Sequence, residues 1–162
     1  MKKLKLILVA VACLLCSVGR AADKSFNSVK FQHLPQLAVN GEQGVSAPFA
    51  GMSNGFVLVA GGCNFPDVPA AEGGQKVFYK SVYVLNVAKG QKAVGWQRLR
   101  DSLTTAVAYG VSVSVPDGVV MIGGTDGQQS LASVVLLSLN NTGDELVQKA
   151  LPQLPQALDN MA

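Results

Sequence analysis

The side chains best suited to bind a ligand follow two double glycines in the chain. Asn64, Phe65 and Asp67 come after Gly61-Gly62, Asp126 comes after Gly123-Gly124, and Tyr109 precedes another glycine. An amide beside an aromatic ring is a typical sugar contact, because the amide hydrogen-bonds hydroxyl groups while the ring stacks on the apolar face. Binding residues concentrate in loops held by a rigid scaffold. We therefore predict a ligand-binding site made of Asn64, Phe65, Asp67, Tyr109 and Asp126.

The candidates of the first loop also have a structural explanation. Asn64 and Phe65 could form a local cap over the end of a sheet instead of a sugar contact. Asp67 shares its long loop with Glu72 and Lys76, and such a loop could equally be solvated and held together by Asp turns and glycine bends. The residue types alone leave both alternatives open.

The remaining two candidates carry similar alternatives. Asp126 is expected to form a turn with Gly127. Tyr109 could reach a central channel, but an aromatic residue in a strand usually belongs to the core.

No catalytic residue can be assigned from the sequence. Cys63 has no base at a recognisable spacing, and a lone cysteine beside apolar residues is usually buried and inert. His33 is the only histidine, which excludes a histidine-based metal cluster and argues against a Ser-His-Asp triad. We predict neither a metal nor a cofactor.

A repeated segment positions these loops. Residues 54–62 and 117–124 each contain a turn dipeptide, an apolar run and a double glycine. The dipeptides Asn54-Gly55 and Asp117-Gly118 supply the positive φ angles of a tight turn, and the apolar run is typical of a buried strand. Paired glycines at a strand end indicate the close approach of another backbone.

The repeat extends in both directions. Residues 81–87 match 133–139 without a gap, and residues 49–53 face 108–112 upstream. The offset falls from 62 at the glycines (61 to 123) to 52 downstream (81 to 133), so the first loop carries ten extra residues.

A unit of about 50 residues with short strands and a double glycine is typical of a kelch propeller blade. We predict an all-β, kelch-type β-propeller with about two four-stranded blades plus flanking strands, which form an incomplete ring. The last strand of the first blade is expected at Trp96–Leu99. The predicted segments are an N-terminal strand and linker completing a last blade at 22–43, blades at 44–107 and 108–155, and the start of a third blade at 156–162.

Residues 1–21 have the pattern of an export signal. A lysine-rich start precedes an apolar core at Leu6–Leu15 that is too short to span a bilayer, and Gly19-Arg20-Ala21 offers small residues for cleavage. The protein is therefore expected to be periplasmic or secreted, with a lipid anchor at Cys13 as the alternative. Removing the signal takes the net charge from +3 to about −1, which argues against a nucleic-acid partner.

Three stretches resemble a family of exported, circularly permuted mutarotases. They are Gly44–Gly51, Ala60–Asp67 and Ala108–Ser112, and the run from Gly61 to Asp67 is the most specific. That family is similar to N-acetylneuraminate epimerase, a six-bladed kelch propeller that interconverts the anomers of sialic acid. The resemblance covers nearly all of residues 30–162 and implies a sialic acid ligand, a bacterial periplasmic location and no cofactor.

The resemblance also implies where catalysis would lie. The family's glutamate follows a glycine-containing strand of a later blade, beyond residue 162, and Val107 stands where related epimerases carry arginine. The expected function is that of an epimerase fragment that belongs to an acid–base enzyme and is inactive alone. The alternative is a non-catalytic kelch module that binds carbohydrate or a protein partner. Open blade edges would favour self-association.

Overall fold

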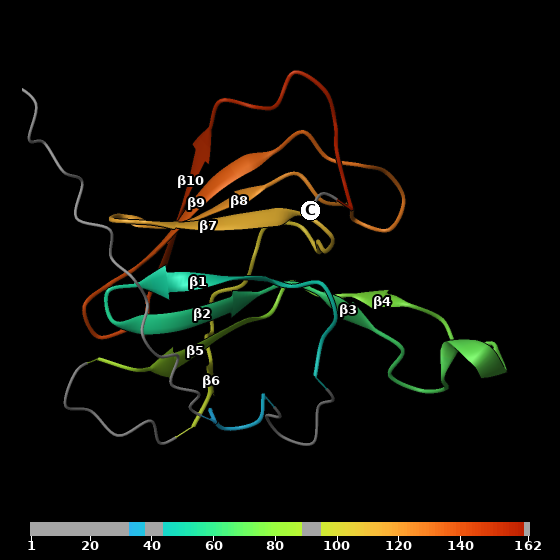
Figure 1. The fold of residues 1–162 in the computed structure, drawn as a ribbon, viewed down its shortest axis with the longest axis horizontal. Helices are drawn as coiled ribbons and strands as arrows, with labels where there is room; N and C mark the ends of the chain where they lie inside the picture. Colours follow the sequence, from blue (N-terminus) through green and yellow to red (C-terminus); the bar gives the residue numbers. More distant parts are fainter. Residues whose placement is uncertain (1–32, 38–43, 89–94, 161–162) are drawn as a thin grey trace, which may run out of the picture. The chain divides into compact units, whose positions relative to one another are not determined.

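The computed structural model describes residues 33–37, 44–88 and 95–160 (Figure 1). From Leu34 onward these residues belong to one compact unit. The predicted export signal, Cys13 and most of the predicted N-terminal segment 22–43 lie outside the described residues. Among the residues that are described, no helix is long and apolar enough to cross a membrane.

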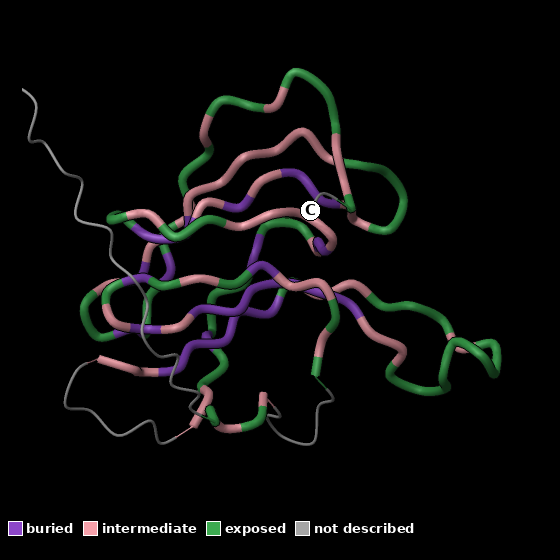
Figure 2. Tube along the Cα trace, in the orientation of Figure 1, coloured by how far each residue is buried: buried purple, intermediate pink, exposed green. Residues whose placement is uncertain are grey.

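The first sheet contains four antiparallel strands in the order β1-β2-β5-β6. Their bounds are β1 Phe49–Ser53, β2 Phe56–Ala60, β5 Val82–Asn86 and β6 Gln97–Arg98. The predicted turn between the first two strands is confirmed, since Asn54 and Gly55 have φ angles of 47° and 81°. The apolar runs of β2 and β5 are almost entirely buried, as Figure 2 shows. The predicted last strand is present but shorter than residues 96–99.

The second sheet repeats this order as β7-β8-β9-β10. Its strands are β7 Val111–Val115, β8 Gly118–Ile122, β9 Val134–Leu139 and β10 Leu146–Leu151. The pairing Val111↔Ile122 corresponds to Phe49↔Ala60 in the first sheet. The predicted match of residues 49–53 with 108–112 was therefore wrong by three residues, because the register of the hairpin, and not the glycine in each stretch, sets the alignment.

The turn of the second hairpin is also built differently from the prediction. Pro116 and Asp117 form it, and Gly118 already belongs to β8 with a φ of 144°. Proline fixes its own φ near −65°, which suits the first central position of an ordinary turn and not the positive φ of an Asn-Gly type turn. The expected Asp-Gly turn is thus shifted by one residue.

The double glycines act identically in the two sheets. All four have positive φ angles, between 60° and 97°. Gly61 donates its N–H to the carbonyl of Ser81 at 2.9 Å, and Gly123 donates to Ser133 at 2.8 Å. The offset of these acceptors is the predicted 52 residues. The repeat inferred from the sequence is therefore confirmed at the level of single hydrogen bonds.

The ten extra residues of the first unit lengthen its loop into a small excursion. It contains β3 Cys63–Asn64, the 3-10 helix η1 Ala70–Glu72 and β4 Val77–Phe78, with β3 and β4 paired. In Figure 1 this excursion extends beyond the ends of β1 and β2. Gly73 follows η1 with a φ of 87°, so the predicted glycine bend is present.

The two sheets meet along β1 and β7, which run side by side (Figure 1). Phe49 is completely buried there and belongs to a core cluster that contains residues of both sheets, including Leu58, Val119 and Leu137. A Cβ atom on Gly51 would lie 2.7 Å from the Ser114 hydroxyl, so a glycine is needed where β1 approaches β7. The predicted all-β architecture of two four-stranded sheets is confirmed.

Side-chain hydroxyls join the facing strands. β1 is an edge strand of its sheet, and its outward main-chain groups are not paired with another strand. The Ser112 hydroxyl accepts from the N–H of Ala50 at 3.0 Å and donates to the carbonyl of the same residue at 2.8 Å. The Ser114 hydroxyl accepts from the N–H of Met52 at 2.9 Å. These bonds satisfy an exposed edge without merging the two ladders.

The segment before the first sheet is held by a tryptophan. Trp96 donates its indole N–H to the carbonyl of Pro35 at 2.9 Å. This bond links the entry of β6 to the chain ahead of the first sheet.

Candidate functional site

A lysine and a tyrosine from different units meet at the ends of the two sheets. The Lys76 ammonium, from the excursion of the first unit, donates to the Tyr109 hydroxyl at 2.8 Å. Tyr109 lies in the segment that enters β7, thirty-three residues further along the chain. The pair therefore forms a bridge between the loop of one unit and the entry of the next.

Aromatic rings surround the ammonium group. The Lys76 nitrogen lies 4.9 Å from the centre of the Tyr109 ring and 5.5 Å from that of Phe65, both within the range of a cation–π contact. The rings of Phe78 and Tyr109 have centroids 6.4 Å apart and are inclined by 56°. We call Phe65, Lys76, Phe78 and Tyr109 the rim cluster.

The charge of the rim cluster is not neutralised locally. No carboxylate of the described residues forms an ion pair with Lys76. The hydrogen bond to the Tyr109 hydroxyl raises the pKa of Lys76 above its ordinary value, so the amine stays protonated at neutral pH. Because Tyr109 accepts this bond with its oxygen, its own hydroxyl hydrogen remains available to a ligand.

Phe65 and Tyr109 are thus brought together, whereas Asn64 is committed to the fold. The Asn64 carbonyl oxygen accepts from the Tyr79 hydroxyl at 2.6 Å, and its NH2 group donates to the main-chain carbonyl of Gly44 at 3.1 Å. Each end of the amide therefore has a partner within the protein, as expected for a local cap. The sugar contact of Asn64 stays a prediction.

The two aspartates do not join the cluster either. Asp67 is exposed within the solvated part of the loop. The Asp126 carboxylate accepts the main-chain N–H groups of Gln128 and Gln129, each at 2.9 Å, in a turn of its own. The bonds from Gln129 and then Gln128 lower the pKa of Asp126 below its ordinary value. The predicted turn of Asp126 with Gly127 is confirmed. Gly127 takes part in it by donating its N–H to the Thr125 hydroxyl.

Tyr109 does not lie in a strand, so the core position expected for a strand aromatic was wrong. Its backbone has a φ of 62° in a bend before β7, and its side chain is half-buried. A bulky residue in this conformation is uncommon, and here the main chain on both sides is held by hydrogen bonds. The ring is directed to the rim because the bend interrupts the alternation of a strand.

Lys76 and Phe78 were not among the residues predicted to form the site. Lys76 belongs to the loop that sequence reasoning considered, but a solvated lysine has the same local pattern. Only the fold shows that a loop of the first unit reaches the entry of the second.

The other reactive side chains are inert or isolated. Cys63 is buried, as expected, and its sulfur faces the carbonyl of Ser46 at 3.8 Å. His33 is exposed. Within the described residues, no three His, Cys, Asp or Glu side chains form a group that could hold a metal ion.

Comparison with known proteins identifies the family. The family model of N-acetylneuraminate epimerase matches residues 16–147, which is more than half of the chain. The N-acetylneuraminate epimerase of Haemophilus influenzae (strain 86-028NP) is 35% identical over 123 residues, covering 68% of this chain and 31% of the relative. The corresponding protein of Vibrio cholerae is 31% identical over 135 residues, covering 77% and 33%.

The fold agrees with a solved structure. The structure of YjhT, a β-propeller, superposes with a TM-score of 0.60 and 26% sequence identity, covering 76% of this chain and 35% of that chain. The chain thus spans about a third of the length of the curated relatives it matches. The recurrent double glycines, the paired four-stranded sheets and the match over residues 16–147 lead to one conclusion: the chain belongs to the N-acetylneuraminate epimerase family.

Proposed function

We propose that this chain contributes two propeller blades and part of the sugar-binding mouth of an N-acetylneuraminate epimerase, which interconverts the anomers of sialic acid. The observation that carries the proposal is the rim cluster, an uncompensated ammonium group beside aromatic rings. N-Acetylneuraminate has a carboxylate and an apolar ring face, and these are the groups that such a cluster attracts.

The reaction sets clear chemical requirements. The bond between the anomeric carbon and the ring oxygen breaks as the anomeric hydroxyl loses a proton and the ring oxygen gains one, and the ring then closes on the other face. This isomerisation needs an acid, a base and a group that orients the carboxylate. Lys76 is suited to the last role, and Tyr109 can donate its hydroxyl hydrogen to a ligand oxygen.

The rim cluster lacks a base. Within the described residues no carboxylate contacts Lys76 or the Tyr109 hydroxyl. We therefore expect this chain to bind the sugar and not to accelerate mutarotation by itself. Periplasmic location and a signal peptide at residues 1–21 remain part of the same proposal.

Binding can be tested by nuclear magnetic resonance titration of the 162-residue chain with N-acetylneuraminate. We expect saturable shifts at Phe65 and Tyr109, and about fivefold weaker binding by Lys76→Met. The matched control is Lys149→Met, because Lys149 is an exposed lysine on β10. Equal affinity of the Lys76→Met variant and the unmodified chain would contradict the proposal.

A second ligand tests whether Lys76 recognises the carboxylate of the sugar. The methyl ester of N-acetylneuraminate keeps the sugar but has no carboxylate, so its binding should not depend on Lys76. Exchange spectroscopy on the same samples measures anomer interconversion. A rate above that of the buffer would contradict the expected lack of turnover, while sugar binding with neither turnover nor dependence on Lys76 would favour the non-catalytic binding module.

A further inference from the structure

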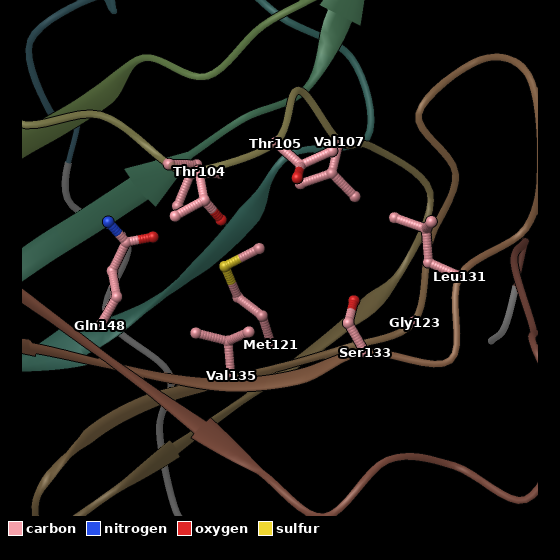
Figure 3. Close-up of a pocket in the computed structure, with 10 residues that line it drawn as sticks. Thr104, Thr105, Val107, Met121, Gly123, Leu131, Ser133, Val135 and Gln148 are labelled. Atoms are coloured by element: carbon pink, nitrogen blue, oxygen red, sulfur yellow. The ribbon is translucent and has the colours of Figure 1, made fainter.

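A cavity lies between the segment that joins β6 to β7 and the second sheet, away from the rim cluster. Its volume is about 160 Å³. The segment between β6 and β7 covers it on one side, and β8, β9 and β10 form the other side (Figure 3). Its lining residues are Leu103, Thr104, Thr105, Val107, Met121, Gly123, Leu131, Ser133, Val135 and Gln148. None of them belongs to the rim cluster.

The apolar wall of this cavity is part of the hydrophobic core. Leu103, Val107 and Met121 are between 4% and 7% exposed and belong to the core cluster shared by the two sheets. Leu131 and Val135 pack against the same cluster. The apolar surface of the cavity is therefore held by packing against the core.

Three hydroxyl groups provide the polar part. Figure 3 shows the oxygens of Thr104, Thr105 and Ser133 directed toward the open space. Within the described part of the chain none of these hydroxyls has a hydrogen-bond partner. Ser133 is held in place by its own carbonyl, which accepts from Gly123. Gln148 donates to the carbonyl of Ser102 at 3.0 Å, so its side-chain oxygen is free to accept.

Size and charge define the ligand class. A cavity of about 150 Å³ holds a single six-membered ring. No lining residue carries a charge, which disfavours an ion because burying an unpaired charge is costly. An apolar wall opposite several hydroxyls suits a ring that is apolar on one face and carries hydroxyl groups at its edge.

We propose that this cavity is a second binding site, for a neutral pyranose sugar. It is separate from the rim cluster and does not rest on the function proposed above. The apolar wall receives the C–H face of the ring, while Thr105 and Ser133 hydrogen-bond its hydroxyl groups from opposite sides.

Titration of the chain with methyl α-glucoside, followed by amide shifts, tests this site. We expect saturable shifts at Gly123, Leu131 and Ser133. Thr105→Phe, which fills the cavity from an exposed position, should weaken binding more than tenfold, and Ser133→Ala should weaken it about fivefold. Glucuronate, a charged ring of the same size, should not bind there.

The controls distinguish the two sites. Lys76→Met should leave methyl α-glucoside binding unchanged, and Thr105→Phe should leave N-acetylneuraminate binding at the rim cluster unchanged. If Thr105→Phe does not fold, Ser133→Ala and Gln148→Leu carry the test. The proposal is overturned if methyl α-glucoside gives no saturable shift, if these variants bind it as well as the unmodified chain, or if only benzene binds.

Discussion

The main-chain N–H of Tyr109 donates to the carbonyl oxygen of Ala47 at 3.1 Å, and both residues have left-handed backbones, with φ angles of 62° and 49°. The same bond follows one unit later, where the N–H of Asn160 donates to the carbonyl of Tyr109 at 2.8 Å and Asn160 has a φ of 48°. The three residues are separated by 62 and 51 positions, the length of a unit. Tyr109 and Asn160 thus each join the entry of a unit to the corresponding position 62 or 51 residues earlier.

Replacement of Tyr109 should show how much the left-handed backbone matters. Tyr109→Asn and Tyr109→Val both remove the ring, but asparagine tolerates this conformation and a β-branched residue does not. We expect the valine variant to be less stable than the asparagine variant by about 1–2 kcal/mol. Urea unfolding measures this difference, and equal stabilities would show that the backbone relaxes.

Replacement of Gly124 by alanine should destabilise the fold more than replacement of Gly73. Gly124 and Gly73 have φ angles of 97° and 87°, but a Cβ on Gly124 would lie 2.6 Å from the carbonyl oxygen of Ala108, whereas Gly73 has nothing within 4 Å. We expect Gly73→Ala to cost about 1 kcal/mol and Gly124→Ala about 2–4 kcal/mol. Denaturant unfolding of the two variants separates backbone conformation from lack of space, and equal losses would refute the steric explanation.

The hydroxyl contact between the sheets should be visible in hydrogen exchange. Ser112→Ala removes the acceptor of the Ala50 N–H, so that amide should exchange at least about fivefold faster. The exchange rate of the Met52 amide should change little, because its N–H donates to the Ser114 hydroxyl. Ser138→Ala is the control, because the Ser138 hydroxyl donates to a carbonyl and no amide depends on it. Unchanged exchange at Ala50 would mean that water replaces the hydroxyl without loss.

Stability should depend on the ionisation of Asp126 at acidic pH. Its pKa is lowered in the folded chain by the N–H groups of Gln129 and Gln128, relative to an ordinary value of 3.8. The stabilisation is therefore present above pH 3.8 and is lost as the pH falls through the lower folded value. The difference in unfolding free energy between the unmodified chain and Asp126→Asn should shrink in that range. A difference that stays constant down to about pH 2.5 would contradict this account.

The double glycines and apolar runs predicted the fold well because they encode local geometry. The strands of both hairpins, the positive φ angles at Asn54 and Gly55, the close approach of another backbone to Gly61 and the ten-residue difference in loop length follow from the residue types. The failures arose where two patterns competed. Pro116 moved the second turn by one residue, and the glycine at 110 suggested a strand where the chain makes a bend.

The site was less predictable because its members belong to different units. Asn64 and Phe65 are neighbours in the sequence, yet the first is used by the fold and the second faces Lys76. Whether an amide bonds a ligand or the Tyr79 hydroxyl depends on a residue fifteen positions away. The contact of Lys76 with Tyr109 depends on how one unit packs on the next, and neither composition nor spacing contains that information.

The excursion formed by β3, η1 and β4 does not change the hydrogen bonds that recur in the two units. Gly62 accepts from the N–H of Tyr79 at 2.9 Å, and Gly124 accepts from Leu131 at 2.7 Å, although seventeen residues separate the first pair and seven the second. The two anchor bonds close loops of unequal length with the same geometry. Such a loop can be lengthened, shortened or exchanged during evolution at little thermodynamic cost, while the hydrogen bonds that hold the two sheets stay the same.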